Sequence, residues 1–97
     1  MVIRYKLNRD IVARTAANFC FELNKFKTTI YLINKTHDTE RIVNAKSLIG
    51  LLQSHLRVND IIELHIDDIV DDVNKIKEIF MEIGREIKWL LIIEYSL

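Results

Sequence analysis

Hydrophobic residues in this chain follow two different periods that alternate along the sequence, and their order constrains the fold more than any other feature. Near the start, Ile3, Tyr5 and Leu7 recur at every second position, which is the pattern of a half-buried strand. Apolar residues from Ala16 to Phe26 recur instead at helical spacing, along one face of an amphipathic helix. These periods predict strands over residues 2–7, 28–34, 41–43 and 62–66, and helices over residues 15–25, 48–56 and 73–83.

The predicted order is strand, helix, strand, strand, helix, strand, helix. Sequences with this order place helices on one face of an antiparallel sheet. We therefore expect an α+β fold in which three helices cover one face of a four-stranded antiparallel sheet, with Gly84 ending the last helix. The 97 residues suffice for one domain, since a chain of this length buries roughly 60–65% of the surface that it exposes when unfolded.

Residues 86–97 form an unusually apolar extension. Trp89, Leu91 and Ile93 would share one face of a strand, whereas a helix would bring a glutamate among the apolar positions. A strand of this kind must cover apolar surface or pair with a sheet edge. We therefore predict that these three residues pack on the preceding domain, residues 1–85, or on a second copy of the chain. A packed helical extension is the alternative.

Composition excludes several classes of protein. Hydrophobic residues make up 49% of the chain, with two glycines and no proline, which excludes disorder and collagen-like sequence. Fourteen basic and fourteen acidic residues give a net charge of zero, and the sequence has no basic stripe. We therefore expect no direct binding of nucleic acid. The single cysteine, Cys20, excludes a disulfide framework and a multi-cysteine zinc site.

No segment has the hydrophobic length of a membrane span. The longest uninterrupted apolar run is residues 89–93, far below the ~20 residues that a span needs. The N-terminus also lacks the apolar core of a signal peptide. We therefore expect a cytoplasmic protein with no membrane partner.

The histidines and the cysteine do not form an obvious reactive site. His37, His55 and His65 are scattered and make no metal-ligand pair at helical or strand spacing. We expect them to be ordinary surface residues, and we expect no metal and no cofactor. Cys20 falls within the apolar stripe of the first predicted helix and is expected in the core.

The element order and two short motifs resemble the HPr family, the small histidine-containing phosphocarriers of the bacterial sugar phosphotransferase system. Residues 11–16, Ile-Val-Ala-Arg-Thr-Ala, resemble the Leu-His-Ala-Arg-Pro-Ala segment around the family's phosphoacceptor. Residues 43–51, Val-Asn-Ala-Lys-Ser-Leu-Ile-Gly-Leu, resemble the family's regulatory-serine segment, Val-Asn-Ala-Lys-Ser-Ile-Met-Gly followed by an apolar residue. The likeness runs over residues 2–84 and allows for a few extra residues around His37. It implies the family's open-faced sandwich.

The first motif differs from the family at the residue that accepts the phosphoryl group. Val12 stands where the family carries its phosphoacceptor histidine. Phosphoryl relay needs a nucleophilic imidazole nitrogen, which valine does not offer. Thr15 replaces the family's proline, and Asp10 brings a carboxylate close to where a phosphoryl group would sit. We therefore expect no phosphocarrier activity at this position, and no enzyme activity.

Arg14 matches the family's arginine that helps to hold the phosphoryl group on the histidine. With Val12 beside it, Arg14 could keep a weak anion site with the helix amides, but the sequence favours the other interpretation. The alternative is a solvated residue at the start of the helix, with no ligand.

Ser47 matches the serine that a kinase modifies in the family, where the phosphoserine form docks on a transcription regulator in carbon catabolite control. A phosphate at a helix N-terminus is favoured by the helix dipole, and it adds about two negative charges that change which partners can dock. The alternative is a plain N-cap serine, which contributes about 1 kcal/mol to stability and nothing else.

The helix after Ser47 carries a wide apolar face. On a helical wheel its apolar residues span an arc of about 160°, wider than the stripe that a surface helix usually buries. By resemblance, the family's docking patch maps onto Leu48, Ile49 and Leu52. An exposed apolar patch usually marks a partner site, unless the C-terminal extension or a second copy covers it.

The sequence therefore favours a non-catalytic bacterial HPr-like protein that acts as a regulatory or protein-docking module. Ser47 would be its phosphorylation switch, with an HPr kinase and a transcription regulator as partners. It is similar to the catabolite-repression HPr-like proteins that lack the histidine. One alternative is a phosphocarrier that uses a substitute residue. Another is an oligomerisation module, a homodimer through its C-terminal extension, in which both phosphosites are vestigial.

Overall fold

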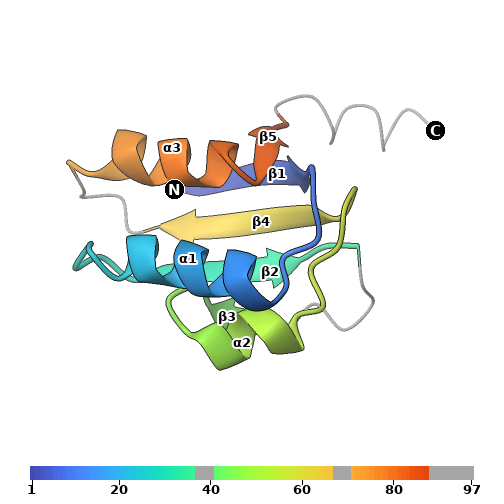
Figure 1. The fold of residues 1–97 in the computed structure, drawn as a ribbon. Helices are drawn as coiled ribbons and strands as arrows, with labels where there is room; N and C mark the ends of the chain where they lie inside the picture. The colour runs from blue at the N-terminus through green and yellow to red at the C-terminus, as the bar shows by residue number, and fades with distance from the viewer. Residues whose placement is uncertain (37–40, 67–70, 88–97) are drawn as a thin grey trace.

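The computed structural model describes residues 1–36, 41–66 and 71–87 (Figure 1). The predicted residues Trp89, Leu91 and Ile93 lie outside this part of the chain, as does His37. The helices and strands in chain order are β1 (Val2–Leu7), α1 (Ala13–Leu23), β2 (Ile30–Asn34), β3 (Ile42–Asn44), α2 (Leu48–Gln53), β4 (Ile61–Ile66), α3 (Val73–Met81) and β5 (Gly84–Glu86).

The strands form one five-stranded antiparallel sheet in the order β3-β2-β4-β1-β5. Figure 1 shows α1 and α3 side by side on one face of the sheet, with α2 next to α1 at the end where β3 lies. The opposite face of the sheet carries no helix among the described residues. The predicted α+β open-faced sandwich is confirmed, and β5 is its additional strand at the edge.

The core lies between the sheet and the helices. The alternation in β1 holds, because Ile3, Tyr5 and Leu7 are all buried. Tyr5 stacks on Phe80 of α3 at 5.5 Å between ring centroids, and Phe80 meets Phe19 of α1 edge-on at 4.7 Å. These aromatic contacts join the sheet to two helices and bury large apolar rings in the core.

Four helix ends differ from the predicted ones: α1 begins at Ala13 and ends at Leu23, α2 ends at Gln53, and α3 ends at Met81. Helix α1 was expected over residues 15–25 but begins at Ala13, because the Thr15 N–H already donates to the Val12 carbonyl at 3.0 Å. Helix α2 was expected to reach residue 56 but ends at Gln53. His55 then takes a left-handed φ of 50°, which turns the chain and brings Leu56 into the core. Helix α2 therefore ends before its apolar pattern does, because Leu56 packs into the core from outside the helix.

The sequence indicates that Gly84 ends the last helix, but in the structure it does not. Helix α3 stops at Met81, and Gly84 is the first residue of β5. A Cβ atom on Gly84 would lie 2.5 Å from the Lys6 carbonyl oxygen of β1. Glycine is needed at this position because β5 approaches β1 more closely than any side chain allows. The additional strand therefore begins earlier than the predicted extension.

Candidate functional site

Ser47 is the N-cap of α2, as predicted. Its hydroxyl oxygen accepts a hydrogen bond from the Gly50 N–H at 3.1 Å. A Cβ atom on Gly50 would lie 3.3 Å from the same hydroxyl oxygen, so a larger residue would crowd the cap. The Ser47 N–H donates in turn to the Asn44 carbonyl at 2.9 Å, and the Asn44 side chain accepts from the Lys46 N–H at 2.9 Å. The second motif thus forms a tight turn that presents one hydroxyl.

The C-terminal end of α1 holds this turn in place. The Lys46 carbonyl accepts hydrogen bonds from the Cys20 thiol at 2.8 Å and from the Asn24 side-chain amide at 3.0 Å. The Lys46 ammonium donates back to the Phe26 carbonyl. Cys20 was expected in the core; it packs partly against the core and also makes this polar contact. Sequence reasoning missed this bracing, although Cys20 and Asn24 share one helix face.

Three apolar side chains of α2 point away from the core. Leu48 is 39% exposed, Ile49 70% and Leu52 41%, whereas Leu51 is fully buried. The wide apolar arc of α2 therefore divides into a buried part and an exposed part. The exposed part is the α2 patch, made up of Leu48, Ile49 and Leu52, and it follows Ser47 directly in the chain.

The start of α1 has no comparable polar organisation. Val12 is the N-cap residue, with φ −130° and ψ 155°, and its side chain makes no capping hydrogen bond. Ala13 has a left-handed φ of 42°, a conformation that costs a residue with a Cβ about 1 kcal/mol. Arg14 is exposed at the surface. The Asp10 carboxylate accepts from the Val58 N–H at 2.9 Å and so fastens this segment to the loop before β4.

The uncovered face of the sheet carries a charged network. The Glu63 carboxylate lies 2.7 Å from the His65 Nε2 and accepts from the Arg4 Nε at 2.9 Å. Burial alone would raise the pKa of Glu63, but the hydrogen bonds and charges of His65 and Arg4 outweigh it and lower this pKa below its ordinary value. Glu63 is therefore held ionised at neutral pH.

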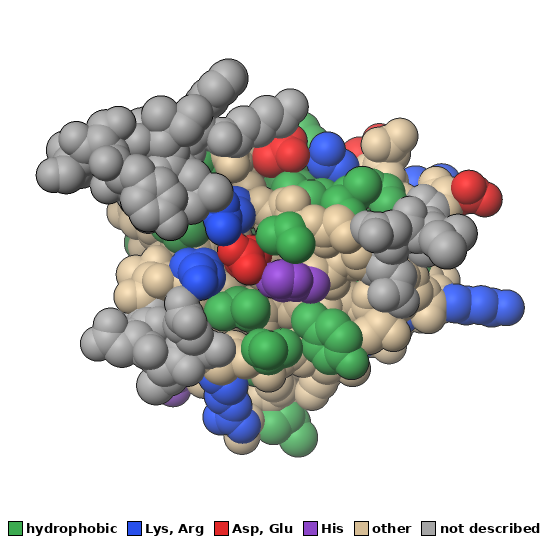
Figure 2. All heavy atoms as spheres, turned by 180° about the vertical axis from the view of Figure 1, so that it is seen from behind, with side chains coloured by type: hydrophobic (Ala, Val, Ile, Leu, Met, Phe, Trp, Pro, Cys, Tyr) green, Lys and Arg blue, Asp and Glu red, His purple; other side chains and the backbone are tan. Residues whose placement is uncertain are grey.

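Apolar side chains surround this network. Figure 2 shows the uncovered face, with a histidine beside an acidic side chain and hydrophobic side chains around them. Tyr31, Ile33, Ile42 and His65 line a hollow of about 260 Å³ on this face. The other described histidine, His55, is exposed beyond α2. Among the described residues, no three histidine, cysteine or acidic side chains gather where they could hold a metal ion.

No helix in the described part of the chain is both long and apolar enough to cross a membrane.

Comparisons with known proteins agree with this fold. Residues 3–81 match the family model described as the PTS HPr component phosphorylation site. The structure is similar to the phosphocarrier protein HPr from Bacillus anthracis, with 22% identity, a TM-score of 0.72, and coverage of 88% of this chain and 96% of that chain. A search of curated proteins found no match.

Two further solved structures share the fold. One is described as HPr-C-His from Thermoanaerobacter tengcongensis, with 23% identity, a TM-score of 0.62, and coverage of 84% of this chain and 85% of that chain. The other is the histidine-containing phosphocarrier protein of Mycoplasma, with 19% identity, a TM-score of 0.67, and coverage of 84% and 93%. Because the family model spans residues 3–81, most of the sequence, this protein belongs to the HPr family of the phosphotransferase system.

Proposed function

We propose that this protein is a regulatory, protein-docking member of the HPr family that does not carry phosphate on a histidine of its first motif. Phosphorylation of Ser47 is its switch, and the α2 patch is its contact surface. The observation that carries this proposal is the position of Ser47, a partly exposed residue that directly precedes the exposed Leu48 and Ile49. The proposed setting is the cytoplasm.

The switch works through charge. A kinase transfers the terminal phosphoryl group of ATP to the Ser47 oxygen, so that a new P–O bond forms, ADP leaves and a base of the kinase takes the hydroxyl proton. The phosphoserine adds about two negative charges next to Leu48 and Ile49. An apolar partner then loses affinity for the α2 patch, whereas a partner with a basic group beside an apolar surface gains it. The proposed partners are an HPr kinase and a transcription regulator.

The start of α1 supports the absence of phosphocarrier activity in the first motif. Val12 is 43% exposed at the cap position but has no nucleophilic atom. Arg14 keeps, in this proposal, only a weak affinity for anions, because it is exposed and solvated. The protein is thus a binding module and not an enzyme.

The proposal is tested by intact-mass analysis after incubation with ATP and a bifunctional HPr kinase. We expect one added phosphoryl group on the wild type and none on Ser47→Ala. Ser54→Ala is the matched control, since Ser54 lies just after the same helix and its hydroxyl donates to the Gly50 carbonyl at 2.8 Å. If none of these proteins gains mass while an authentic HPr is modified in the same tube, Ser47 is not a switch.

Phosphate transfer through a substitute residue is the second candidate, and His65 favours it. A carboxylate that binds one imidazole nitrogen orients the ring and leaves the other nitrogen free to attack. Glu63 binds the Nε2 of His65 in this way, and the His65 side chain is 39% exposed. Incubation with phosphoenolpyruvate and the first enzyme of the system would then add an acid-labile phosphoryl group, which His65→Gln would abolish. An unchanged mass of the wild-type protein in that assay excludes this function.

A further inference from the structure

The uncovered face of the sheet presents exposed apolar side chains around its charged network (Figure 2). Val2 is 53% exposed, Tyr31 46% and Ile42 62%. In the strand register, His65 lies opposite both Val2 and Tyr31. Ile33 lies opposite Ile42, two residues along from Tyr31, so all these side chains point to the same side of the sheet. Apolar residues gathered on one exposed face usually mark a contact surface, and the proposed regulatory function makes no use of this one.

The charged network at the centre of this face needs no further partner. One oxygen of the Glu63 carboxylate lies 2.7 Å from the His65 Nε2. The other oxygen accepts from the Arg4 Nε at 2.9 Å and lies 2.8 Å from the Arg4 Nη2. Covering a charge is costly when it is left unpaired. Because both oxygens of Glu63 are engaged, an apolar segment can cover this face without leaving that carboxylate unpaired.

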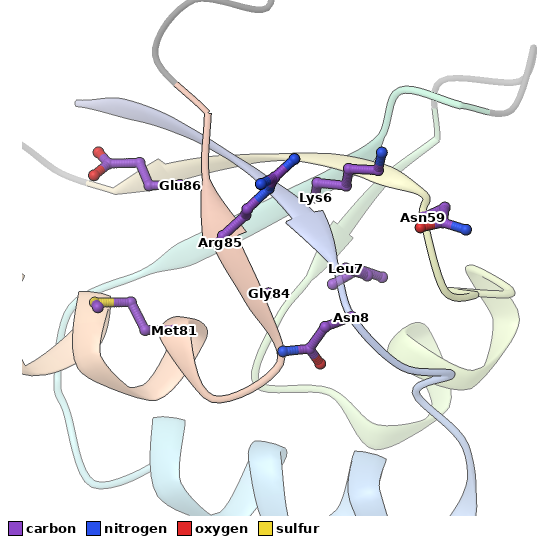
Figure 3. A pocket seen from close by; sticks show the side chains of 8 residues that line it. All are labelled: Lys6, Leu7, Asn8, Asn59, Met81, Gly84, Arg85 and Glu86. Carbon is purple, nitrogen blue, oxygen red and sulfur yellow. The ribbon is translucent and has the colours of Figure 1, made fainter.

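The chain leaves the described structure on this same face. The Ile87 N–H donates to the Arg4 carbonyl at 2.8 Å, which continues the pairing of β5 with β1 by one residue. Directly opposed residues of an antiparallel pair point to the same side, so the Ile87 side chain lies on the uncovered face with that of Arg4. The neighbouring opposed pair, Lys6 and Arg85, shares this side, and Figure 3 shows both side chains projecting away from the helices.

The residues that follow Ile87 are long enough and apolar enough to cover this face. Strands β1 and β4 separate β5 from β2, so the hollow lined by Tyr31 and Ile42 begins roughly 14 Å from the edge where Ile87 lies. Residues 88–97 span roughly 33 Å when extended. At about 3.3 Å per residue, Leu91 reaches β2 and Ile93 reaches β3. Seven of the residues 88–97 are apolar, which matches the surface that they would cover.

We propose that residues 88–97 fold back across the uncovered face of their own sheet. Leu91 and Ile93 pack into the hollow beside Tyr31 and Ile42, and Trp89 lies nearer to Ile87, over β1 and β4. An attached segment is present at its site at an effective concentration in the millimolar range. The sheet of the same chain is therefore favoured over that of a second copy. This segment closes the face that the helices leave open, and it leaves Ser47 and the α2 patch accessible.

The first test uses Trp89, the one tryptophan of the sequence, as a fluorescent probe of the segment. We expect the emission of a buried indole and weak quenching by acrylamide in the wild type. Ile42→Lys places a charge beside the hollow and should shift the emission to the red and strengthen the quenching. Ile49→Lys is the matched control, since Ile49 is similarly exposed, 70% against 62%, but lies on α2. Circular dichroism checks that both variants are folded.

Three outcomes of this test overturn the proposal. The first is the emission of a solvated indole in the wild type, and the second is an unchanged emission in folded Ile42→Lys. The third is a red shift in Ile49→Lys alone, which would place the segment on α2. Phosphorylation of Ser47 is measured in a separate assay, so failure of this proposal is distinguishable from failure of the proposed switch.

The second test is NMR of the wild-type chain, which depends on no variant. We expect nuclear Overhauser contacts between the methyl groups of Ile33 or Ile42 and those of Leu91 or Ile93. In a mixture of labelled and unlabelled protein, contacts within one chain are separated from contacts between two chains. Contacts between chains would assign the face to a second copy and overturn the proposal. Contacts of residues 88–97 with Ile49, or with none of the described residues, would also overturn it.

Discussion

Helices α1 and α2 both begin in segments that resemble the family's two phosphorylation motifs, but the two helix starts are organised differently. At α2, the Ser47 hydroxyl accepts from the Gly50 N–H, and the turn before it is closed by side-chain and backbone hydrogen bonds. At α1, Val12 occupies the cap position without a side-chain hydrogen bond, and Ala13 takes a left-handed φ of 42°. Side-chain hydrogen bonds therefore stabilise the start of α2, whereas the cap residue of α1 makes none.

This difference shows which end of α1 contributes to the candidate site. The polar contacts of α1 lie at its C-terminal end, where Cys20 and Asn24 both donate to the Lys46 carbonyl. This carbonyl belongs to the residue before Ser47. Helix α1 thus braces the serine turn, and both helices contribute to one candidate site.

The largest expected loss of stability distinguishes the buried face of α2 from its exposed face. Leu51 is fully buried, so Leu51→Ala should lower the free energy of unfolding by about 3 kcal/mol. Leu52 is 41% exposed, and Leu52→Ala should cost less than about 1 kcal/mol. Urea denaturation of both variants measures the difference. Equal losses would place Leu52 in the core and remove the α2 patch as a free contact surface.

The next effect compares the two helix starts directly. Ser47→Ala removes a capping hydrogen bond and should lower the free energy of unfolding by about 1 kcal/mol. Val12→Ala removes only part of an exposed side chain with no capping bond, so its cost should be about 0.5 kcal/mol or less. Urea denaturation is again the measurement. A larger loss for Val12→Ala would reverse the comparison.

Local features of the fold could be predicted from the sequence because the contacts that create them are local. The alternation of Ile3, Tyr5 and Leu7 identified a strand, since neighbouring side chains of a strand point to opposite faces. The cap at Ser47 was also predictable, because its hydrogen bond spans only three residues, to Gly50. Fold class followed from the order of such segments.

Contacts between distant residues could not be predicted in the same way. The bracing of the serine turn joins Cys20 to Lys46, and no periodic pattern relates these positions. Gly84 shows the same limit, because a glycine that directly follows a helical apolar stripe predicts a helix end. Its role depends on the Lys6 carbonyl, which lies close only after β5 has paired with β1.

A smaller effect is expected from the bracing of the serine turn. Asn24→Ala loses the hydrogen bond to the Lys46 carbonyl and should lower the free energy of unfolding by about 0.5–1 kcal/mol. Asn18→Ala is the control, because Asn18 is exposed on the same helix and makes no side-chain hydrogen bond within the described residues. In a double-mutant cycle, Asn24→Ala and Ser47→Ala should be non-additive by about 0.5 kcal/mol. Strict additivity would separate the end of α1 from the serine site.

The last comparison concerns the C-terminal extension, whose deletion is expected to have no effect on Ser47 phosphorylation. The chain leaves the described structure at Ile87, whose N–H donates to the Arg4 carbonyl of β1 at 2.8 Å. This edge of the sheet is opposite to the edge on which α2 packs. Deleting residues 88–97 should therefore leave the rate of Ser47 phosphorylation unchanged in the kinase assay.

Light scattering on the same two proteins tests the alternative role of Trp89, Leu91 and Ile93 in joining two copies. If they do so, the deletion halves the molar mass while Ser47 is phosphorylated as before. A faster phosphorylation after deletion would mean that the extension covers α2. The exposed residues of α2 would then have an occupant within the protein itself, and the serine turn would be a covered cap that is not available to a partner.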